Sequence, residues 1–106
     1  MISEERVEAA VAFIRDNAEK LGQLTGRAKA LEYRAKVIKA QAYLDAEGTI
    51  QARESEALCT TEYKQIIDEI ENCFADRTTL ETKIRAAELT IETWRSQNKW
   101  ADRGHL

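Results

Sequence analysis

Residues 59–94 read CTTEYKQIIDEIENCFADRTTLETKIRAAELTIETW, and their apolar side chains recur at steps of four and three in strict alternation. Only Arg77 interrupts the series. Sustained heptad spacing is the pattern of a helix that packs along a narrow seam. Thr78 and Glu81 have the spacing of a capping box that would break such a helix. The unbroken phase across Arg77 nevertheless favours one helix over about residues 50–98. The expected seam comprises Cys59, Tyr63, Ile66, Ile70, Cys73, Arg77, Leu80, Ile84, Ala87, Ile91 and Trp94.

A second series with the same spacing lies upstream, over about residues 17–46. This helix is expected to end before Gly48, because glycine commonly follows a helix C-terminus, and Thr49 suits the N-cap of the next helix. Two helices of similar length joined at residues 47–49 would fold back on each other. The sequence therefore predicts an all-α fold, a long antiparallel coiled-coil-like hairpin forming one domain over residues 1–98. The upstream seam comprises Leu24, Ala28, Leu31, Ala35, Ile38 and Ala42.

The N-terminal segment is expected to form a short helix over about residues 4–15. Ser3 is the predicted N-cap, and Glu4 and Glu5 follow in the first turn, where the helix dipole favours acids. Val7, Val11 and Ile14 mark one face of this helix. Asp16 and Glu19 have the spacing of a capping box, so a break is predicted there. One continuous helix is the alternative, because Ala18 and Leu21 extend the same stripe.

A second apolar stripe lies on the opposite face of the upstream helix and comprises Tyr33, Val37, Ala40 and Leu44. A helix that is apolar on two opposite faces usually packs between two neighbours. Since a lone two-helix hairpin buries little apolar area, we expect a homodimer that forms a helical bundle. The residues expected in the core or the dimer seam are Leu31, Ile38, Tyr63, Ile66, Ile70, Ile84, Ile91 and Trp94.

Composition and charge exclude several classes of protein. There is no proline, charged residues make up 33% of the chain, and aromatic residues make up 7%, which favours long helices over a compact globule. The net charge of −3 argues against nucleic-acid binding through overall charge, although a local basic patch remains open. No apolar stretch is long enough to span a membrane, and the acidic N-terminus is unlike a secretory signal. We therefore expect a cytoplasmic protein with reduced cysteines.

No catalytic, metal or cofactor site is expected. Cys59 and Cys73 lie two heptads apart on the seam, too far apart for a disulfide on one helix, and the only histidine is His105. The carboxylates alternate with lysine and arginine, as they do on solvated helix faces. Glycines 22, 26 and 48 match no phosphate-binding loop. The sequence thus predicts a protein that is not an enzyme and takes no small-molecule substrate.

The candidate binding residues lie in two places. Residues 94–103 contain both tryptophans, and Arg95, Lys99 and Arg103 would form one basic edge if the helix continued into the tail, residues 99–106. An exposed Trp100 beside these cations suits a nucleic-acid base or a protein partner. The alternative is that Trp100 packs on the first helix near Ile2 and Val7. The second place is the basic run over residues 27–39, in which Lys29 and Lys36 share one face; its alternative is a solvated face paired with acidic neighbours.

Several segments resemble small all-helical proteins of unknown function encoded in the early or recombination regions of tailed bacteriophages and prophages. They are Glu32-Tyr33-Arg34-Ala35-Lys36, Glu47-Gly48-Thr49 with Ala52-Arg53-Glu54, Tyr63, and Ile91-Glu92-Thr93-Trp94-Arg95-Ser96-Gln97-Asn98. The resemblance implies a phage accessory protein in the host cytoplasm and carries over no residue roles. Such proteins tend to be richer in arginine after residue 98.

Three functions are consistent with these features. The leading hypothesis is a non-enzymatic accessory protein that binds DNA or a DNA-processing protein. The second is an inhibitor of a host defence system, similar in kind to anti-CRISPR proteins, that presents an acidic helical surface to a protein. The third is a structural coiled-coil adaptor. The acidic residues behind the second hypothesis are Glu54, Glu56, Glu62, Asp68, Glu69, Glu71 and Asp76.

Overall fold

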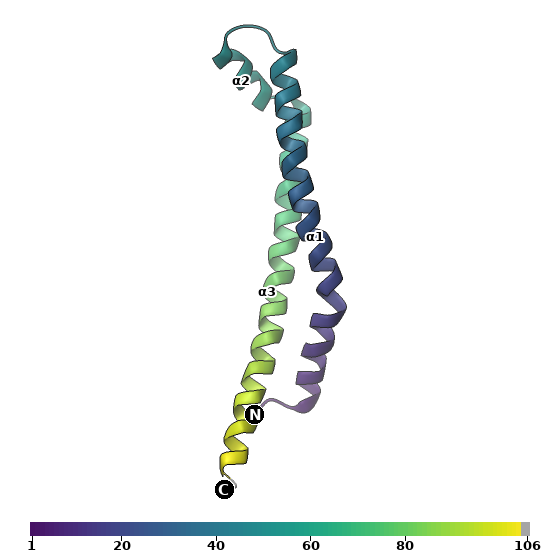
Figure 1. Ribbon diagram of the computed structural model, residues 1–106, viewed down its shortest axis with the longest axis vertical. Coiled ribbons are helices and arrows are strands. Elements are labelled where there is room, and N and C mark those ends of the chain that lie inside the picture. Colours follow the sequence, from purple (N-terminus) through teal and green to yellow (C-terminus); the bar gives the residue numbers. More distant parts are fainter. Residues whose placement is uncertain (105–106) are drawn as a thin grey trace. The chain divides into compact units, whose positions relative to one another are not determined.

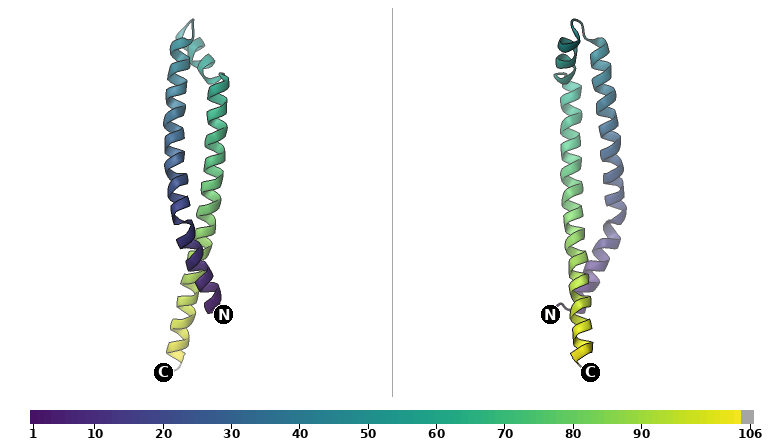
Figure 2. Two further views of the ribbon diagram at one scale, coloured as in Figure 1. Left: turned by 90° about the vertical axis from the view of Figure 1, so that its right-hand side faces the viewer. Right: turned by 60° about the vertical axis from the view of Figure 1, so that its left-hand side comes forward.

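The computed structural model describes the backbone of residues 1–104 and the side chains of residues 1–100. The chain forms three helices in the order α1 (Glu4–Asp45), α2 (Ile50–Leu58) and α3 (Thr61–Gly104), and residues 1–104 contain no strand. The predicted all-α fold based on one pair of long helices is confirmed. The contacts divide the chain into two units, Gln23–Arg77 and Met1–Gly22 with Thr78–Leu106. In each unit an α1 segment lies beside an α3 segment that runs the opposite way (Figures 1 and 2).

The core of the Gln23–Arg77 unit is the predicted seam. Ala28, Leu31 and Ala35 of α1 pack with Ile66 and Cys73 of α3 in one buried cluster. Small and branched side chains alternate in this cluster, which lets the two helices approach closely while leaving little void. The partly buried side chains that complete it are Leu24, Ile38 and Ile70.

The connection between the long helices carries both predicted turn signals. Gly48 has a φ of 111°, a conformation that glycine adopts at little cost. The Thr49 hydroxyl accepts a hydrogen bond of 3.1 Å from the backbone N–H of Ala52 and so caps α2. The α2 helix packs back on α1, where the Arg53 guanidinium lies 5.9 Å from the centre of the Tyr43 ring, within range of a cation–π contact.

The prediction of one helix over residues 50–98 is wrong at its N-terminal end. The α2 helix ends at Leu58, and the Thr60 hydroxyl accepts a hydrogen bond of 3.2 Å from the backbone N–H of Tyr63, which caps a new helix. The break removes Cys59 from the expected seam and leaves it exposed. From Tyr63 to Trp94 every predicted seam residue is buried or half-buried, and α3 continues past Thr78 and Glu81 without a break.

The Met1–Gly22 and Thr78–Leu106 segments form the second unit. Val7 and Ala10 of α1 are buried, as are Leu80 and Ile84 of α3. The Ser3 hydroxyl accepts a hydrogen bond of 3.2 Å from the backbone N–H of Arg6, which confirms the predicted N-cap. The contributions of α3 to this part of the seam are Leu80, Ile84, Ala87, Ile91 and Trp94.

The predicted break near Asp16 is wrong, because α1 runs without interruption from Glu4 to Asp45. The amide of Asn17 donates a hydrogen bond of 2.8 Å to the carbonyl of Phe13, so this polar residue is satisfied within the helix. The predicted face was right at Val7 and Ile14 and wrong at Val11, which is exposed while Ala10 is buried in its place. The buried or half-buried seam of this part of α1 is Val7, Ala10, Ile14, Asn17 and Leu21.

The glycines provide a test of these local assignments. A Cβ atom built on Gly26 in α1 has no neighbouring atom within 4 Å, so Gly26→Ala is expected to raise the free energy of unfolding by about 1 kcal/mol. Gly48→Ala is expected to lower it by about the same amount or more, because alanine disfavours a positive φ. Urea unfolding followed by circular dichroism measures both variants. If both variants changed the free energy of unfolding by the same amount and in the same direction, the assigned backbone conformations would be contradicted.

Candidate macromolecule-binding surfaces

The outer face of α1 in the Gln23–Arg77 unit combines an aromatic ring with cations. The Tyr33 side chain is 71% exposed. Lys29 lies four residues before it and Lys36 three residues after it, so both lysines flank the ring on the helix surface, and both are exposed. Val37, half exposed at 50%, continues the apolar patch along the helix. We call Lys29, Tyr33, Lys36 and Val37 the α1 outer face.

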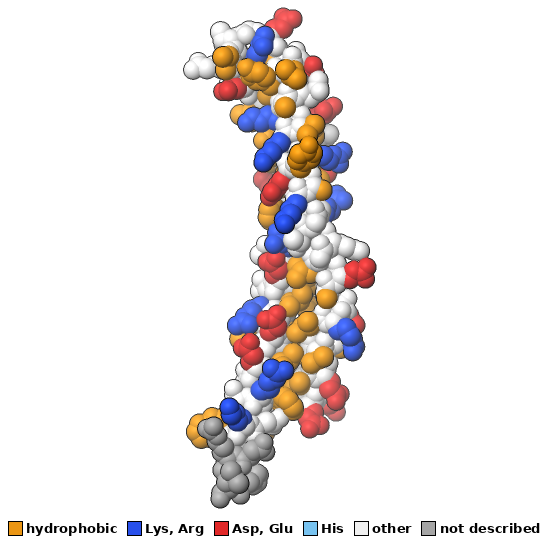
Figure 3. Space-filling view, in the orientation of Figure 1, with side chains coloured by type: hydrophobic (Ala, Val, Ile, Leu, Met, Phe, Trp, Pro, Cys, Tyr) orange, Lys and Arg blue, Asp and Glu red, His pale blue; other side chains and the backbone are white. Residues whose placement is uncertain are grey.

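The cations of this face are available to a partner. In the described part of the chain, no ion pair involves Lys29, Lys36 or Lys39. Arg27, at the edge nearer α3, lies 4.0 Å from the Glu69 carboxylate, so this member of the basic run does have an acidic neighbour. Figure 3 shows lysine and arginine side chains gathered around apolar ones in the upper part of the view.

Trp100 is 75% exposed and does not pack near Ile2 and Val7. It borders a shallow hollow with Met1, Thr93, Ser96 and Gln97. The contact that ties the N-terminus to α3 is instead a hydrogen bond of 2.8 Å from the backbone N–H of Ile2 to Oε1 of Gln97. The alternative in which Trp100 closes this end of the helix pair is therefore wrong.

The tryptophan and the cations at the C-terminal end of α3 point in different directions. Arg95 and Lys99 are both exposed and lie about 40° apart on the helix, whereas Trp100 lies about 100° from Lys99 and about 140° from Arg95. The side chain of Arg103 lies outside the described residues. Trp100 instead aligns with uncharged residues of α3, so the expected aromatic–basic surface is divided between two faces.

The residues expected in the core or dimer seam pack between α1 and α3 of the same chain. Each is buried or half-buried where α1 and α3 pack in its own unit, and Leu31, Ile66, Ile38 and Ile70 belong to or pack against the buried cluster described above. Their packing is therefore accounted for by the pairing of α1 with α3 within one chain. By contrast the second stripe of α1, which comprises Tyr33, Val37, Ala40 and Leu44, is exposed along its whole length.

The acidic residues lie on α2 and on the α3 segment of the same unit, and all are exposed. Glu62, Glu69 and Asp76 are seven residues apart and form one edge of α3, along which Glu69 faces Arg27. On α3, Asp68 and Glu71 face other directions, whereas Glu56 of α2 lines one pocket together with Glu62. The acidic residues therefore do not form a single continuous ridge along α3.

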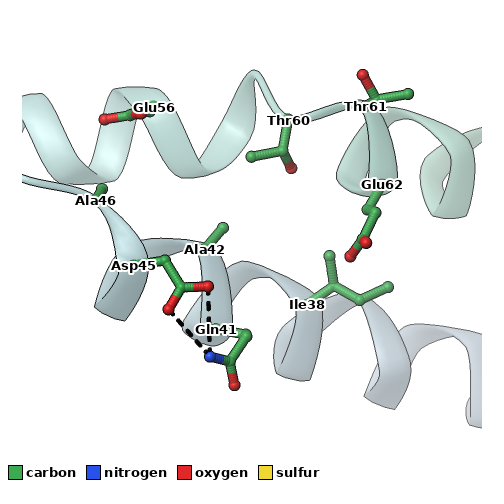
Figure 4. Close-up of a pocket in the computed structure, with 9 residues that line it drawn as sticks. All are labelled: Ile38, Gln41, Ala42, Asp45, Ala46, Glu56, Thr60, Thr61 and Glu62. Carbon is green, nitrogen blue, oxygen red and sulfur yellow. Dashed lines mark hydrogen bonds between the residues drawn. The ribbon is translucent and has the colours of Figure 1, made fainter.

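A pocket of about 330 Å³ lies where α2 covers the ends of α1 and α3 (Figure 4). Its wall includes the carboxylates of Asp45, Glu56 and Glu62, and Asp45 is held by Gln41, whose amide donates to it at 3.3 Å. The pocket contains no histidine, cysteine or lysine side chain. The charged residues of this lining are all carboxylates, which disfavours an anionic ligand.

Among the described residues, no group of three or more metal-ligating side chains comes together, and no helix is sufficiently long and apolar to cross a membrane. Cys73 is buried, as predicted, and its sulfur lies 3.5 Å from the carbonyl oxygen of Leu24. Both cysteines are free thiols.

Sequence reasoning did not assign Tyr33 to a binding site. Its apolar stripe was assigned to packing against a neighbour, while Lys29 and Lys36 were considered separately as a basic face. The signal was nevertheless present, because an aromatic residue at i between lysines at i−4 and i+3 forms one surface on a helix.

Searches of protein-family models, of curated proteins and of solved structures find no similar protein.

Two neighbouring positions of α1 test the assignment of its faces. Leu31 is 3% exposed and Tyr33 is 71% exposed. Leu31→Ala is expected to lower the free energy of unfolding by about 2–5 kcal/mol, because it leaves a cavity in the seam. Tyr33→Ala is expected to change it by less than about 0.5 kcal/mol. Chemical unfolding of the two variants measures both values, and a large loss in Tyr33→Ala would mean that this ring is packed rather than free.

Proposed function

We propose that the chain is a non-enzymatic accessory protein that self-associates and binds DNA through the α1 outer face. The observation that carries the proposal is the exposed Tyr33 ring between Lys29 and Lys36, neither of which has an ion-pair partner among the described residues. Lysines neutralise backbone phosphates, and an exposed ring stacks on a base, so the combination suits a single strand whose bases are accessible.

The distribution of charge supports a local contact. The net charge of the chain is −3, yet residues 27–39 contain Arg27, Lys29, Arg34, Lys36 and Lys39 against Glu32 alone. An acidic protein with one basic face would bind nucleic acid at that face and be repelled elsewhere. Arg95 and Lys99 on α3 supply a second, smaller cationic edge.

The sequence resemblance supports the biological setting. Its segments include Glu32-Tyr33-Arg34-Ala35-Lys36, which contains the central ring of the α1 outer face. The proteins it resembles have no assigned function, but they are encoded beside phage recombination functions, which work on DNA in the bacterial cytoplasm. We therefore place the proposed activity there.

A protein partner is the second candidate, either for a coiled-coil adaptor or for an inhibitor of host defence. Tyr33, Val37 and Leu44 form an exposed apolar stripe of the kind that marks protein contacts. The exposed carboxylates on α2 and α3 offer a partner of opposite charge. A pull-down from host cells distinguishes this candidate from the first, because a protein partner remains bound after nuclease treatment whereas a DNA-mediated one is lost.

The DNA contact is tested by fluorescence anisotropy with labelled single-stranded and double-stranded oligonucleotides over a range of salt concentrations. Lys29→Glu/Lys36→Glu is expected to abolish binding at physiological salt. Lys29→Ala/Lys36→Ala is expected to flatten the slope of log affinity against log salt by about 2. The matched control is Lys64→Ala/Lys83→Ala, which removes the same charge from exposed positions of α3.

Tyr33→Ala is expected to weaken binding of the single strand by about 1–3 kcal/mol, with little effect on the duplex, because stacking requires accessible bases. Failure of the wild-type protein to bind either oligonucleotide at low salt would contradict the proposal. Equal losses of DNA affinity in the lysine variant and in its control would contradict a defined site, because they would show that only the total charge of the protein matters.

A further inference from the structure

The α3 helix carries a second heptad stripe on the side opposite its seam. Its members are spaced by three and four residues, all are exposed, and none is charged. Leu89 is 46% exposed and Trp100 is 75% exposed, so the stripe leaves substantial apolar area in contact with water. We call this set the α3 outer stripe: Thr79, Thr82, Ala86, Leu89, Thr93, Ser96 and Trp100.

Two of the four hydroxyl groups on this stripe donate hydrogen bonds to the backbone of their own helix. Thr82 donates a hydrogen bond of 2.9 Å to the carbonyl of Thr78, and Thr93 donates one of 2.8 Å to the carbonyl of Leu89. A hydroxyl that already has a partner loses less free energy when it leaves water than one without a partner. Thr82 and Thr93 can therefore be buried against another helix at low cost, through their methyl groups.

The stripe continues into an apolar groove between α1 and α3 of the same unit. Ala86 of the stripe lines this groove together with Ala9, Phe13 and Thr90. Figure 3 shows apolar side chains following one another along the lower half of the view. Small side chains on both sides of a contact allow two helix axes to approach to about 8 Å.

We infer that the α3 outer stripe is the surface through which two copies of the chain associate, with their α3 helices antiparallel. This inference deepens the self-association that forms part of the proposed function and rests on it in that respect. The antiparallel register places Leu89 of one copy on Ala86 of the second, so that each large side chain meets a small one. Thr82 then faces Thr93 of the second copy, and Thr79 faces Ser96 of the second copy.

The charges beside the stripe match this orientation. Arg85 and Glu92 both flank Leu89, and Arg85 reaches Glu92 at 3.4 Å and Glu88 at 3.2 Å within the chain. In the antiparallel pair, the helix edge that carries Arg85 and Glu92 lies against the same edge of the second copy. The second copy runs in the opposite direction, so the order of the two residues along the contact is reversed. Arg85 of each copy therefore faces Glu92 of the other, and twofold symmetry repeats the pair.

A parallel pair fits the same residues less well. Each layer would then contain two identical side chains, so that Leu89 meets Leu89 while Ala86 meets Ala86, and bulky layers would alternate with empty ones. The edges that carry Arg85 and Glu92 would lie on opposite sides of the contact, where their charges do not meet. The exposed stripe of α1 is also a weaker candidate for self-association, because Lys29, Arg34 and Lys36 would approach like charges.

The mass of the full chain in solution, measured by sedimentation equilibrium, tests the surface. The wild type is expected to be a dimer, and Leu89→Glu a monomer with unchanged far-ultraviolet circular dichroism. Val11→Glu is the matched control, because Val11 lies in the same unit, is 46% exposed like Leu89, and is outside the stripe. A monomeric wild type, a dimeric Leu89→Glu, or equal dissociation of both variants would overturn the inference.

The orientation is tested by exchanging the flanking charges. Arg85→Glu and Glu92→Arg are each expected to dissociate at least tenfold more readily than the wild type, because each creates two repulsive pairs across the contact. A mixture of the two variants is expected to form a heterodimer, in which an acidic edge meets a basic one. A gain of association on mixing cannot arise from unfolding. Unchanged association of the single variants, or no association on mixing, would overturn the antiparallel arrangement.

The test of self-association can be separated from the test of DNA binding, because Leu89→Glu leaves Lys29, Tyr33 and Lys36 unaltered. A dimeric wild-type protein that fails to bind either oligonucleotide would support this inference while contradicting the proposed DNA contact. A monomeric protein that binds DNA through the α1 outer face would overturn this inference and the self-association on which it rests, while supporting the DNA contact.

Discussion

Interdigitation of alanine with larger side chains holds α1 against α3. It determines which residues of the two helices remain exposed and can contact a partner. In the Gln23–Arg77 unit Ala28, Leu31 and Ala35 meet Ile66 and Cys73 in a buried cluster. Because the seam is narrow, each helix buries only about two of every seven positions there. The remaining positions face outward. Their side chains can vary to suit a binding partner without disturbing the seam.

The outer positions differ between the two units. In the Gln23–Arg77 unit the outer face of α1 combines Tyr33 with unpaired lysines, which suits a polyanion. In the other unit the outer stripe of α3 is uncharged and rich in threonine, alanine and serine, which suits a second helix. The charges that border this stripe, Arg85 and Glu92, carry opposite signs and lie 3.4 Å apart within the chain. In the proposed antiparallel dimer, each would face the opposite charge of the second copy. One heptad pattern thus serves the fold, while a second, on the opposite face, stays exposed and is the one that we propose for recognition.

Heptad phase allowed much of this architecture to be predicted from sequence. The phase from Tyr63 to Trp94 identified the α3 seam, since few other arrangements bury those residues together. It failed where polar residues occupy seam positions or caps. The capping-box spacing of Asp16 and Glu19 predicted a break, but it lies inside a continuous helix, where Asn17 satisfies its amide on the carbonyl of Phe13. Thr60 caps α3 through its hydroxyl, which the apolar spacing alone does not reveal. The exposure of Trp100 and Tyr33 depends on what packs nearby, so their spacing could not decide whether they were core or surface.

The central claim is that the seam forms within one chain and leaves the outer faces for partners. The most direct test is the helix content of the monomeric Leu89→Glu chain, measured by circular dichroism together with its urea midpoint, across a wide range of protein concentration. The structure predicts that both quantities are independent of concentration, because α1 and α3 pair within the same molecule. Loss of helix and a falling midpoint on dilution would contradict the account, since they would show that the seam is formed between helices of different copies.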